Sequence, residues 1–319
     1  MTADAVIEAH LTHLRVQRRL AERTLAMYAD AFARMGALMA PATSLTEVKP
    51  HHVRGWVGRL HAQGLGPRSI AIHLAAWRGL FKWMSQDGLI AFNPADGIKA
   101  PKAPKPLPKA LGVDQAVALA EASAQAAPIR AGDTRGERES PWLTARDHAM
   151  VELLYGSGLR NAELLGLDVQ ASPHAAGWVD LVSAEAHVLG KGHKRRTVPV
   201  GSVAVQALKA WLAVREELPP HTDGALFISR LGQRLTSVQL RNRLKQIAIR
   251  AGLPTHVHPH MLRHSFASHV LQSSGDLRGV QELLGHAHIT TTQVYTKLDF
   301  QHLAKVYDAA HPRARKRET

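Results

Sequence analysis

The chain contains no cysteine, which excludes disulfide bonds, thiolate nucleophiles and every zinc site built on sulfur ligands. Aromatic residues make up only 5% of the sequence, and acidic residues are also few, 26 against 40 Lys and Arg. No apolar run approaches the roughly 20 residues that span a bilayer. The opening residues, MTADAVIEAHLTHLRVQRRL, carry charges where a signal peptide needs an apolar core. These absences predict a soluble protein of a reducing compartment, the cytoplasm.

The excess of basic residues gives a formal net charge of +14 and a sequence pI near 10.4. Such a surface favours polyanions, of which nucleic acid is the commonest soluble kind. A basic protein without a nucleic-acid partner remains an alternative on composition alone. The length of 319 residues is enough for two domains, each with its own core.

Residues 1–98 predict a small helical bundle. Thr24 can cap a helix over LAMYADAFARMGALM. In SIAIHLAAWRGLFKWM the apolar residues recur at steps of three and four, which predicts one buried helix face made by Ile70, Leu74, Trp77, Phe81 and Met84.

The segment KAPKAPKPLPKAL, residues 99–111, holds four lysines and four prolines. Closely spaced prolines exclude a helix and a central strand, so this segment predicts an extended interdomain linker. Its lysines either keep the linker soluble or cross a phosphate backbone, and the sequence leaves both alternatives open. We therefore expect a first domain over 1–98, the linker over 99–111 and a second domain over 112–319.

The second domain predicts mostly helices, including VDQAVALAEASAQ and LTARDHAMVELLYGSG, with a polar loop between them. Residues 177–200 alternate apolar and polar residues in short pieces broken by turns, which predicts a small antiparallel sheet with Lys191 in its last turn. Helices are expected again from about residue 203 to 310. The predicted fold class is mainly α with a small antiparallel β-sheet.

Four stretches carry residues suited to chemistry. In GSGLRNAELLGL, Arg160 begins a helix with Glu163 one turn on, a spacing at which the carboxylate can fix the guanidinium. The alternative is an exposed pair worth less than about 1 kcal/mol. In LGKGHKRRTVPV, glycines flank Lys191, although a lysine in such a turn is commonly just solvated.

The third stretch, HVHPHMLRHSFASH, places His260 and Arg263 at the start of a helix. One helical turn puts imidazole and guanidinium on the same face, where both can meet one phosphate. A rival is a zinc site, because His256, His258 and His260 alternate and His264 follows at i,i+4. The missing Glu of H-E-x-x-H and the lack of a nearby carboxylate disfavour the metal.

The fourth stretch, GHAHITTTQVYT, places His286 and His288 ahead of Tyr295. Its glycine ends one helix, and its threonines can cap a following helix that carries Tyr295. A tyrosine on such a helix is normally core, but a phenol held beside a proton acceptor can be a nucleophile.

Together the four stretches resemble the tyrosine recombinase family over nearly the whole chain. The strings LLGH and TTTQVYT are similar to the family's signature around its nucleophile. His288 falls outside the matching motif, and the loop 128–141 and the path from Arg160 to Lys191 look like insertions. The order Arg, Lys, His-x-x-Arg, His, Tyr implies the catalytic residues Arg160, Lys191, His260, Arg263, His286 and Tyr295.

The resemblance implies an N-terminal SAM-like core-binding domain and a C-terminal catalytic domain that close around double-stranded DNA. It implies cutting and rejoining at a specific recombination site through a 3′-phosphotyrosine intermediate, without metal, ATP or cofactor. The implied role is the resolution of chromosome dimers at cell division, with a homologous sister recombinase in a heterotetramer and a DNA translocase. Alternatives are a type IB topoisomerase and a non-catalytic DNA-binding protein.

The residue types suit the implied reaction. Two guanidiniums can clamp the non-bridging oxygens of a phosphodiester in place of a metal ion, helped by His260 or His286. A tyrosine of pKa near 10 is phenolate in only about one molecule per thousand at pH 7, a deficit of roughly 4 kcal/mol. Nearby cations and a base offset this deficit, with His260 as candidate base and Lys191 as general acid. The family also implies that a helix from about 303 to 311 docks onto a neighbouring protomer; the alternative is packing on its own domain.

Overall fold

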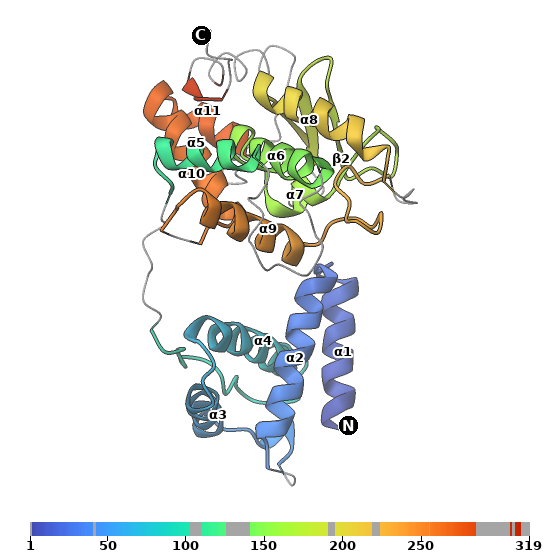
Figure 1. The fold of residues 1–319 in the computed structure, drawn as a ribbon. Coiled ribbons are helices and arrows are strands. Elements are labelled where there is room, and N and C mark those ends of the chain that lie inside the picture. Colours follow the sequence, from blue (N-terminus) through green and yellow to red (C-terminus); the bar gives the residue numbers. More distant parts are fainter. Residues whose placement is uncertain are drawn as a thin grey trace, which may run out of the picture. The chain divides into compact units, whose positions relative to one another are not determined.

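We describe the protein from a computed structural model. The described residues are 2–40, 43–102, 110–125, 141–190, 195–218, 224–254, 256–284, 307 and 310–313. The chain divides into two compact units, Met1–Pro106 and Leu107–Thr319 (Figure 1). Of the expected linker, residues 103–109 lie outside the described residues. No helix in the described part of the chain is long and apolar enough to cross a membrane.

Unit 1 is a helical bundle. Its elements are α1 (Ala3–Val16), α2 (Glu22–Leu38), the short 3-10 helix η1 (Leu45–Glu47), α3 (Pro50–Ala62) and α4 (Pro67–Gln86). Prolines begin α3 and α4 because their missing N–H is not needed in the first turn. The cap expected at Thr24 is wrong: α2 begins at Glu22, since the carbonyl oxygen of Ala21 already accepts from the backbone N–H of Thr24 at 2.8 Å.

The apolar face predicted for α4 is confirmed. All five of its side chains are at most 2% exposed: Ile70, Leu74, Trp77, Phe81 and Met84. The indole Nε1 of Trp77 donates to the carbonyl oxygen of Ala31 at 2.8 Å, which joins α4 to α2. Burial of each such side chain contributes roughly 1.5–3 kcal/mol, so this face is the main support of the bundle.

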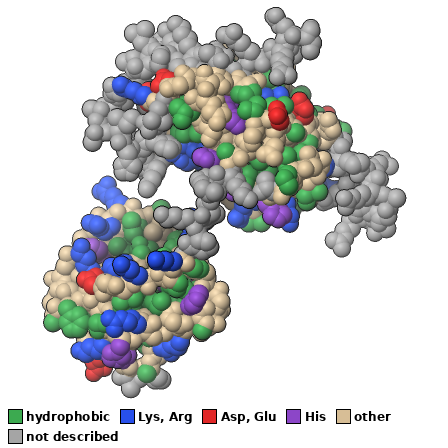
Figure 2. All heavy atoms as spheres, turned by 90° about the vertical axis from the view of Figure 1, so that its left-hand side faces the viewer, with side chains coloured by type: hydrophobic (Ala, Val, Ile, Leu, Met, Phe, Trp, Pro, Cys, Tyr) green, Lys and Arg blue, Asp and Glu red, His purple; other side chains and the backbone are tan. Residues whose placement is uncertain are grey.

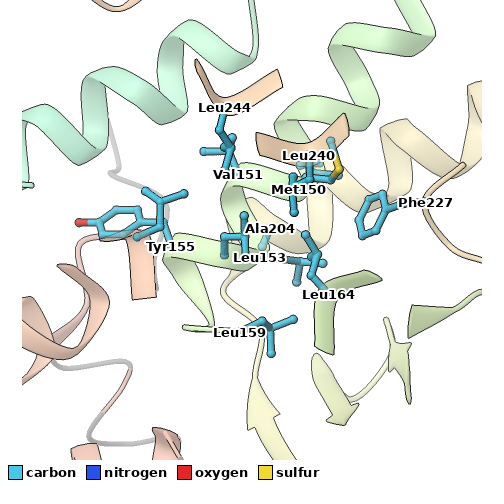
Figure 3. Close-up of a cluster of buried hydrophobic side chains, with 14 of the residues drawn as sticks. Met150, Val151, Leu153, Tyr155, Leu159, Leu164, Ala204, Phe227, Leu240 and Leu244 are labelled. Carbon is cyan, nitrogen blue, oxygen red and sulfur yellow. The ribbon is translucent and has the colours of Figure 1, made fainter. Parts of the chain in front are cut away.

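Unit 2 is built around one buried helix. Its helices are α5 (Val113–Ser123), α6 (Pro141–Gly156), α7 (Asn161–Leu165), α8 (Ser202–Arg215), α9 (Ser237–Arg250), α10 (Pro259–Ser274) and α11 (Leu277–Leu284). Helix α6 is buried along every residue from Ala149 to Gly156 because α5, α8 and α10 all pack against it. In Figure 3 the α6 side chains Met150, Val151 and Leu153 lie among side chains of α8 and α9.

A four-stranded sheet flanks these helices in the order β1-β2-β3-β4. Its strands are β1 (Leu167–Asp168), β2 (Gly177–Asp180), β3 (Glu185–Leu189) and β4 (Arg195–Pro199). The antiparallel pairing expected within 177–200 is present between β2, β3 and β4. The two-residue β1 adds a parallel pair with β2, so the sheet is mixed. Two residues are too few to show an alternating pattern in the sequence.

The described residues near the C-terminus pack on their own unit. Tyr307, Ala310 and His311 are at most 7% exposed. Tyr307 and Ala310 lie in a cluster with side chains of α10 and α11, and the ring of His311 packs against that of Phe266 on α10. The guanidinium of Arg313 forms an ion pair with the fully buried Glu152 of α6. Docking of this segment onto a neighbouring protomer stays a prediction.

Candidate active site

A tight turn after α6 carries the first site residue. Helix α6 ends at Gly156, and Gly158 takes a positive φ of 59° that reverses the chain. Leu159 and Leu164 are fully buried and anchor the turn in the core (Figure 3). Arg160 is thereby held at the N-cap of α7, about a third exposed, with its guanidinium outside the hydrophobic cluster.

Glu163 gathers guanidiniums from three parts of the chain. Its Oε1 accepts from Nη1 of Arg160 at 2.7 Å, and its Oε2 accepts from the backbone N–H of Arg160 at 2.8 Å. Arg196 of β4 donates to both oxygens, at 2.5 Å and 2.9 Å. Nη1 of Arg263 lies 4.0 Å from Oε2. The predicted pairing of Arg160 with Glu163 is confirmed, and it belongs to a buried cluster rather than to an exposed pair.

The charges in this cluster shift one another. Burial by itself raises the pKa of the Glu163 carboxyl, but the hydrogen bonds and charges of Arg196 and Arg160 outweigh it and lower the pKa to about 2. Burial, with the charges of Arg160 and Arg196, lowers the pKa of Arg263 to about 9, against the raising effect of Glu163. At neutral pH the carboxylate is therefore ionised and the guanidinium of Arg263 is still largely protonated.

Arg263 is fixed by backbone oxygens as well as by charge. It lies on α10 and is 8% exposed. Its Nη1 donates to the carbonyl oxygen of Gly158 at 2.5 Å, and its Nη2 donates to the carbonyl oxygen of Leu284, the last residue of α11. The guanidinium therefore connects the turn before α7 with the end of α11, and it shares Glu163 with Arg160.

His260 lies on the first turn of α10 and is exposed, whereas Arg263 one turn on is buried. The ring of His258 caps this helix, because its Nδ1 accepts from the backbone N–H of Met261 at 3.2 Å. The ring centroids of His258 and His260 are 6.5 Å apart. No group of three or more His, Asp or Glu side chains able to hold a metal ion occurs among the residues described.

Half of the predicted catalytic set can be placed. Arg160 and Arg263 meet at Glu163, and His260 is on the helix of Arg263. Lys191, His286 and Tyr295 lie outside the described residues, as does His288.

Sequence reasoning missed Arg196. It follows Lys191 closely in the sequence, and its burial was open to prediction. Strand residues alternate between faces, and Arg196 shares its face with the buried Val198. A buried charge at such a position requires a partner.

Two family models match the chain. Residues 7–88 match the phage integrase N-terminal SAM-like domain, and residues 137–302 match the phage integrase family. The chain belongs to the phage integrase family, the tyrosine recombinases.

Individual relatives give a more specific match than the family models. It is 52% identical to tyrosine recombinase XerC 1 of Ralstonia nicotianae, covering 98% of this chain and 94% of that protein. It is 46% identical to tyrosine recombinase XerC of Pseudomonas aeruginosa, covering 99% and 97%.

Solved structures support the fold. The XerH site-specific recombinase bound to a palindromic difH substrate aligns with a TM-score of 0.63 at 24% identity, covering 91% of this chain and 81% of that one. The Tn1549 transposon integrase in complex with circular intermediate DNA aligns with a TM-score of 0.66 at 19% identity, covering 93% and 97%.

Proposed function

We propose that this chain is a site-specific recombinase of the XerC kind, which cuts and rejoins double-stranded DNA. The observation that carries the proposal is that Arg160 and Arg263, far apart in the sequence, share one buried carboxylate. Three guanidiniums face Glu163, so the cluster keeps an excess of positive charge. Such an excess at a partly exposed arginine suits the charge that develops on a phosphate during transesterification.

The proposed reaction uses six residues. The phenol oxygen of Tyr295 attacks phosphorus and the bond from phosphorus to the 5′-oxygen breaks, leaving a 3′-phosphotyrosine. His260 takes the phenol proton, and Lys191 protonates the leaving 5′-oxygen. Arg160, Arg263 and His286 stabilise the charge on the non-bridging oxygens. Attack by a 5′-hydroxyl of another duplex reverses these steps and rejoins the strands without ATP.

Charge supports a DNA substrate. Figure 2 shows Lys and Arg side chains spread over the visible face of unit 1, where acidic ones are few. Exposed basic residues of its helices include Arg54 on α3 and Arg68 and Lys82 on α4. We propose that domains 1–98 and 112–319, joined by the linker 99–111, both contact the duplex, with phosphate contacts supplying most of the affinity.

The finer role follows from the names of the relatives. We propose that the chain acts in the cytoplasm with a XerD-like sister recombinase in a heterotetramer on DNA, and that a DNA translocase activates it. Resolution of chromosome dimers during cell division is the proposed outcome.

Trapping the covalent complex tests the function. A nicked suicide substrate that loses its 5′-hydroxyl fragment should hold wild-type protein covalently on DNA. Tyr295→Phe should abolish the covalent complex and leave DNA binding intact, while the control Tyr28→Phe in unit 1 should behave as wild type. An unchanged covalent complex with Tyr295→Phe would refute the assignment. Relaxation of supercoils without exchange between two sites would point instead to a type IB topoisomerase.

A further inference from the structure

We infer that Arg196 is a positioning residue for DNA cleavage, which holds Glu163 in place and through it the guanidinium of Arg160. The inference rests on the proposed function, and it adds a residue from the sheet to a site otherwise supplied by turns and helices. Arg196 is assigned no contact with the DNA.

The geometry of the pair is bidentate. Both terminal nitrogens of Arg196 reach the carboxylate, Nη1 to Oε1 at 2.5 Å and Nη2 to Oε2 at 2.9 Å. A fork of this kind fixes the plane of a carboxylate, and here it adds to the two hydrogen bonds from Arg160. Because Nη1 of Arg160 binds the same Oε1, the orientation of this plane sets where the Arg160 guanidinium lies.

Arg196 and Arg160 differ in how far their side chains are exposed to solvent. The side chain of Arg196 is 7% exposed, whereas that of Arg160 is 31% exposed. A phosphate arriving from solvent can therefore reach Arg160, while Arg196 is buried against the same carboxylate oxygen that Arg160 binds. Because both of its terminal nitrogens donate to Glu163, we assign Arg196 a role through this carboxylate.

The sheet fixes Arg196 in turn. In the ladder of β3 and β4, Arg196 is paired with Val188. Its neighbour Arg195 points to the other face, where its guanidinium lies 5.2 Å from the ring centroid of Trp178 and its Nη2 donates to the carbonyl oxygen of Ala175 at 2.9 Å. The two arginines therefore have separate partners on opposite faces of the sheet, and only Arg196 contacts Glu163.

The pair is a costly way to secure a strand. The Nε of Arg196 is buried and has no hydrogen-bond partner within the part of the chain that is described. A buried donor without a partner costs free energy, and buried ion pairs are often no more stabilising than apolar side chains. Positioning gives this arrangement a reason that stability alone does not.

The test measures cleavage rate separately from binding and folding. Single-turnover cleavage of the nicked suicide substrate is followed at saturating protein, with Kd measured by gel shift and folding checked by thermal unfolding. Arg196→Met should lower the cleavage rate about 10- to 100-fold, because a shift of about 1 Å in a charged group costs up to about 100-fold. The Kd should change less than about threefold. The control Arg195→Met, of equal charge in the same strand, should stay within about threefold of wild type at saturation.

Two further variants make the inference falsifiable even if Arg196→Met folds poorly. Arg196→Lys keeps the charge without the fork and should still be at least about tenfold slow. In a Glu163→Gln background, Arg196→Met should slow cleavage by less than about threefold more, since its effect passes through Glu163. A wild-type rate in Arg196→Lys, or losses that multiply in the double variant, would overturn the positioning role. Failure of the proposed function is distinguishable, because then wild-type protein forms no covalent complex.

Discussion

The carbonyl oxygen of Gly158 accepts a hydrogen bond of 2.5 Å from Nη1 of Arg263, 105 residues further along the chain. The backbone of Gly158 has a φ of +59°. A Cβ at this position would lie 2.5 Å from Cδ1 of Phe266, one turn beyond Arg263 on α10. The turn before Arg160 therefore approaches α10 as closely as it does because residue 158 has no side chain.

Gly158→Ala should be strongly destabilising. The left-handed backbone costs about 1–2 kcal/mol with a side chain, and displacement of Phe266 adds about 1–3 kcal/mol. The expected loss is therefore about 3 kcal/mol in the free energy of unfolding by urea. The control is Gly252→Ala, where φ is +65° and the Cβ would meet nothing within 4 Å, so only the backbone cost applies. Equal losses in the two variants would show that contact with Phe266 is unimportant.

Stability should depend on pH through Glu163. Its pKa is about 2 in the folded protein against an ordinary 4.5. Because the folded-state pKa is depressed, the carboxylate stabilises the fold above about pH 4.5, and this stability is lost as the pH falls toward about 2. The shift corresponds to about 3 kcal/mol.

Glu163→Gln should accordingly cost about 3 kcal/mol at pH 7, and the gap to wild type should narrow when urea unfolding is repeated at pH 3. The exposed Glu217 provides the control, and Glu217→Gln should have little effect at either pH. A gap that stays constant with pH would contradict the assigned ionisation of Glu163.

Lys191→Ala should slow cleavage of ordinary DNA by about 100-fold or more, as loss of a general acid does. A substrate with sulfur in place of the bridging 5′-oxygen should restore most of the rate, because a thiolate leaves without being protonated. Lys194→Ala, in the same segment between β3 and β4, is the control and should cleave both substrates at nearly the wild-type rate. If the sulfur substrate restored cleavage by Lys194→Ala and not by Lys191→Ala, the assignment of the general acid to Lys191 would be wrong.

Arg313 should anchor the C-terminal segment by compensating Glu152. The Glu152 side chain is 0% exposed, and Nδ1 of His148 lies 3.9 Å from Oε1 of the same carboxylate. Arg313→Met leaves this carboxylate without its guanidinium and should cost about 3 kcal/mol in urea unfolding. Adding Glu152→Gln should recover part of the loss. Arg278→Met breaks a pair whose arginine is 71% exposed and should cost less than about 1 kcal/mol.

The sequence predicted the elements with strong periodicity. The buried face of α4 was readable because five apolar residues follow helical spacing. The start of α2 was not, because Thr24 is a favourable cap residue but the backbone oxygen of Ala21 begins the helix instead. The parallel pair of β1 with β2 is fixed by tertiary contact and leaves no local pattern.

The residues of the site also divide into those that local spacing reveals and those that only the fold brings together. Glu163 was found because it stands one helical turn from Arg160, a local relation. Arg196 meets Glu163 only through the fold of the sheet, 33 residues away, so motif spacing does not reveal it. The available signal was that Arg196 lies on the same strand face as Val198. This signal identifies a buried charge but not the residue that pairs with it.

In β4, Arg195 contacts Trp178 and Arg196 contacts Glu163, so the site depends on the register of this strand as well as on its position. A slip of one residue against β3 would move every side chain of β4 to the opposite face, taking Arg196 away from Glu163 and Val198 out of the core. Changes in the length of the segment joining β3 and β4 leave this register unchanged as long as the same residues of the two strands stay paired. When loops are exchanged between members of the family, the junctions should therefore lie outside the paired residues of β3 and β4. A shift by an odd number of residues within the paired region would turn every side chain to the opposite face.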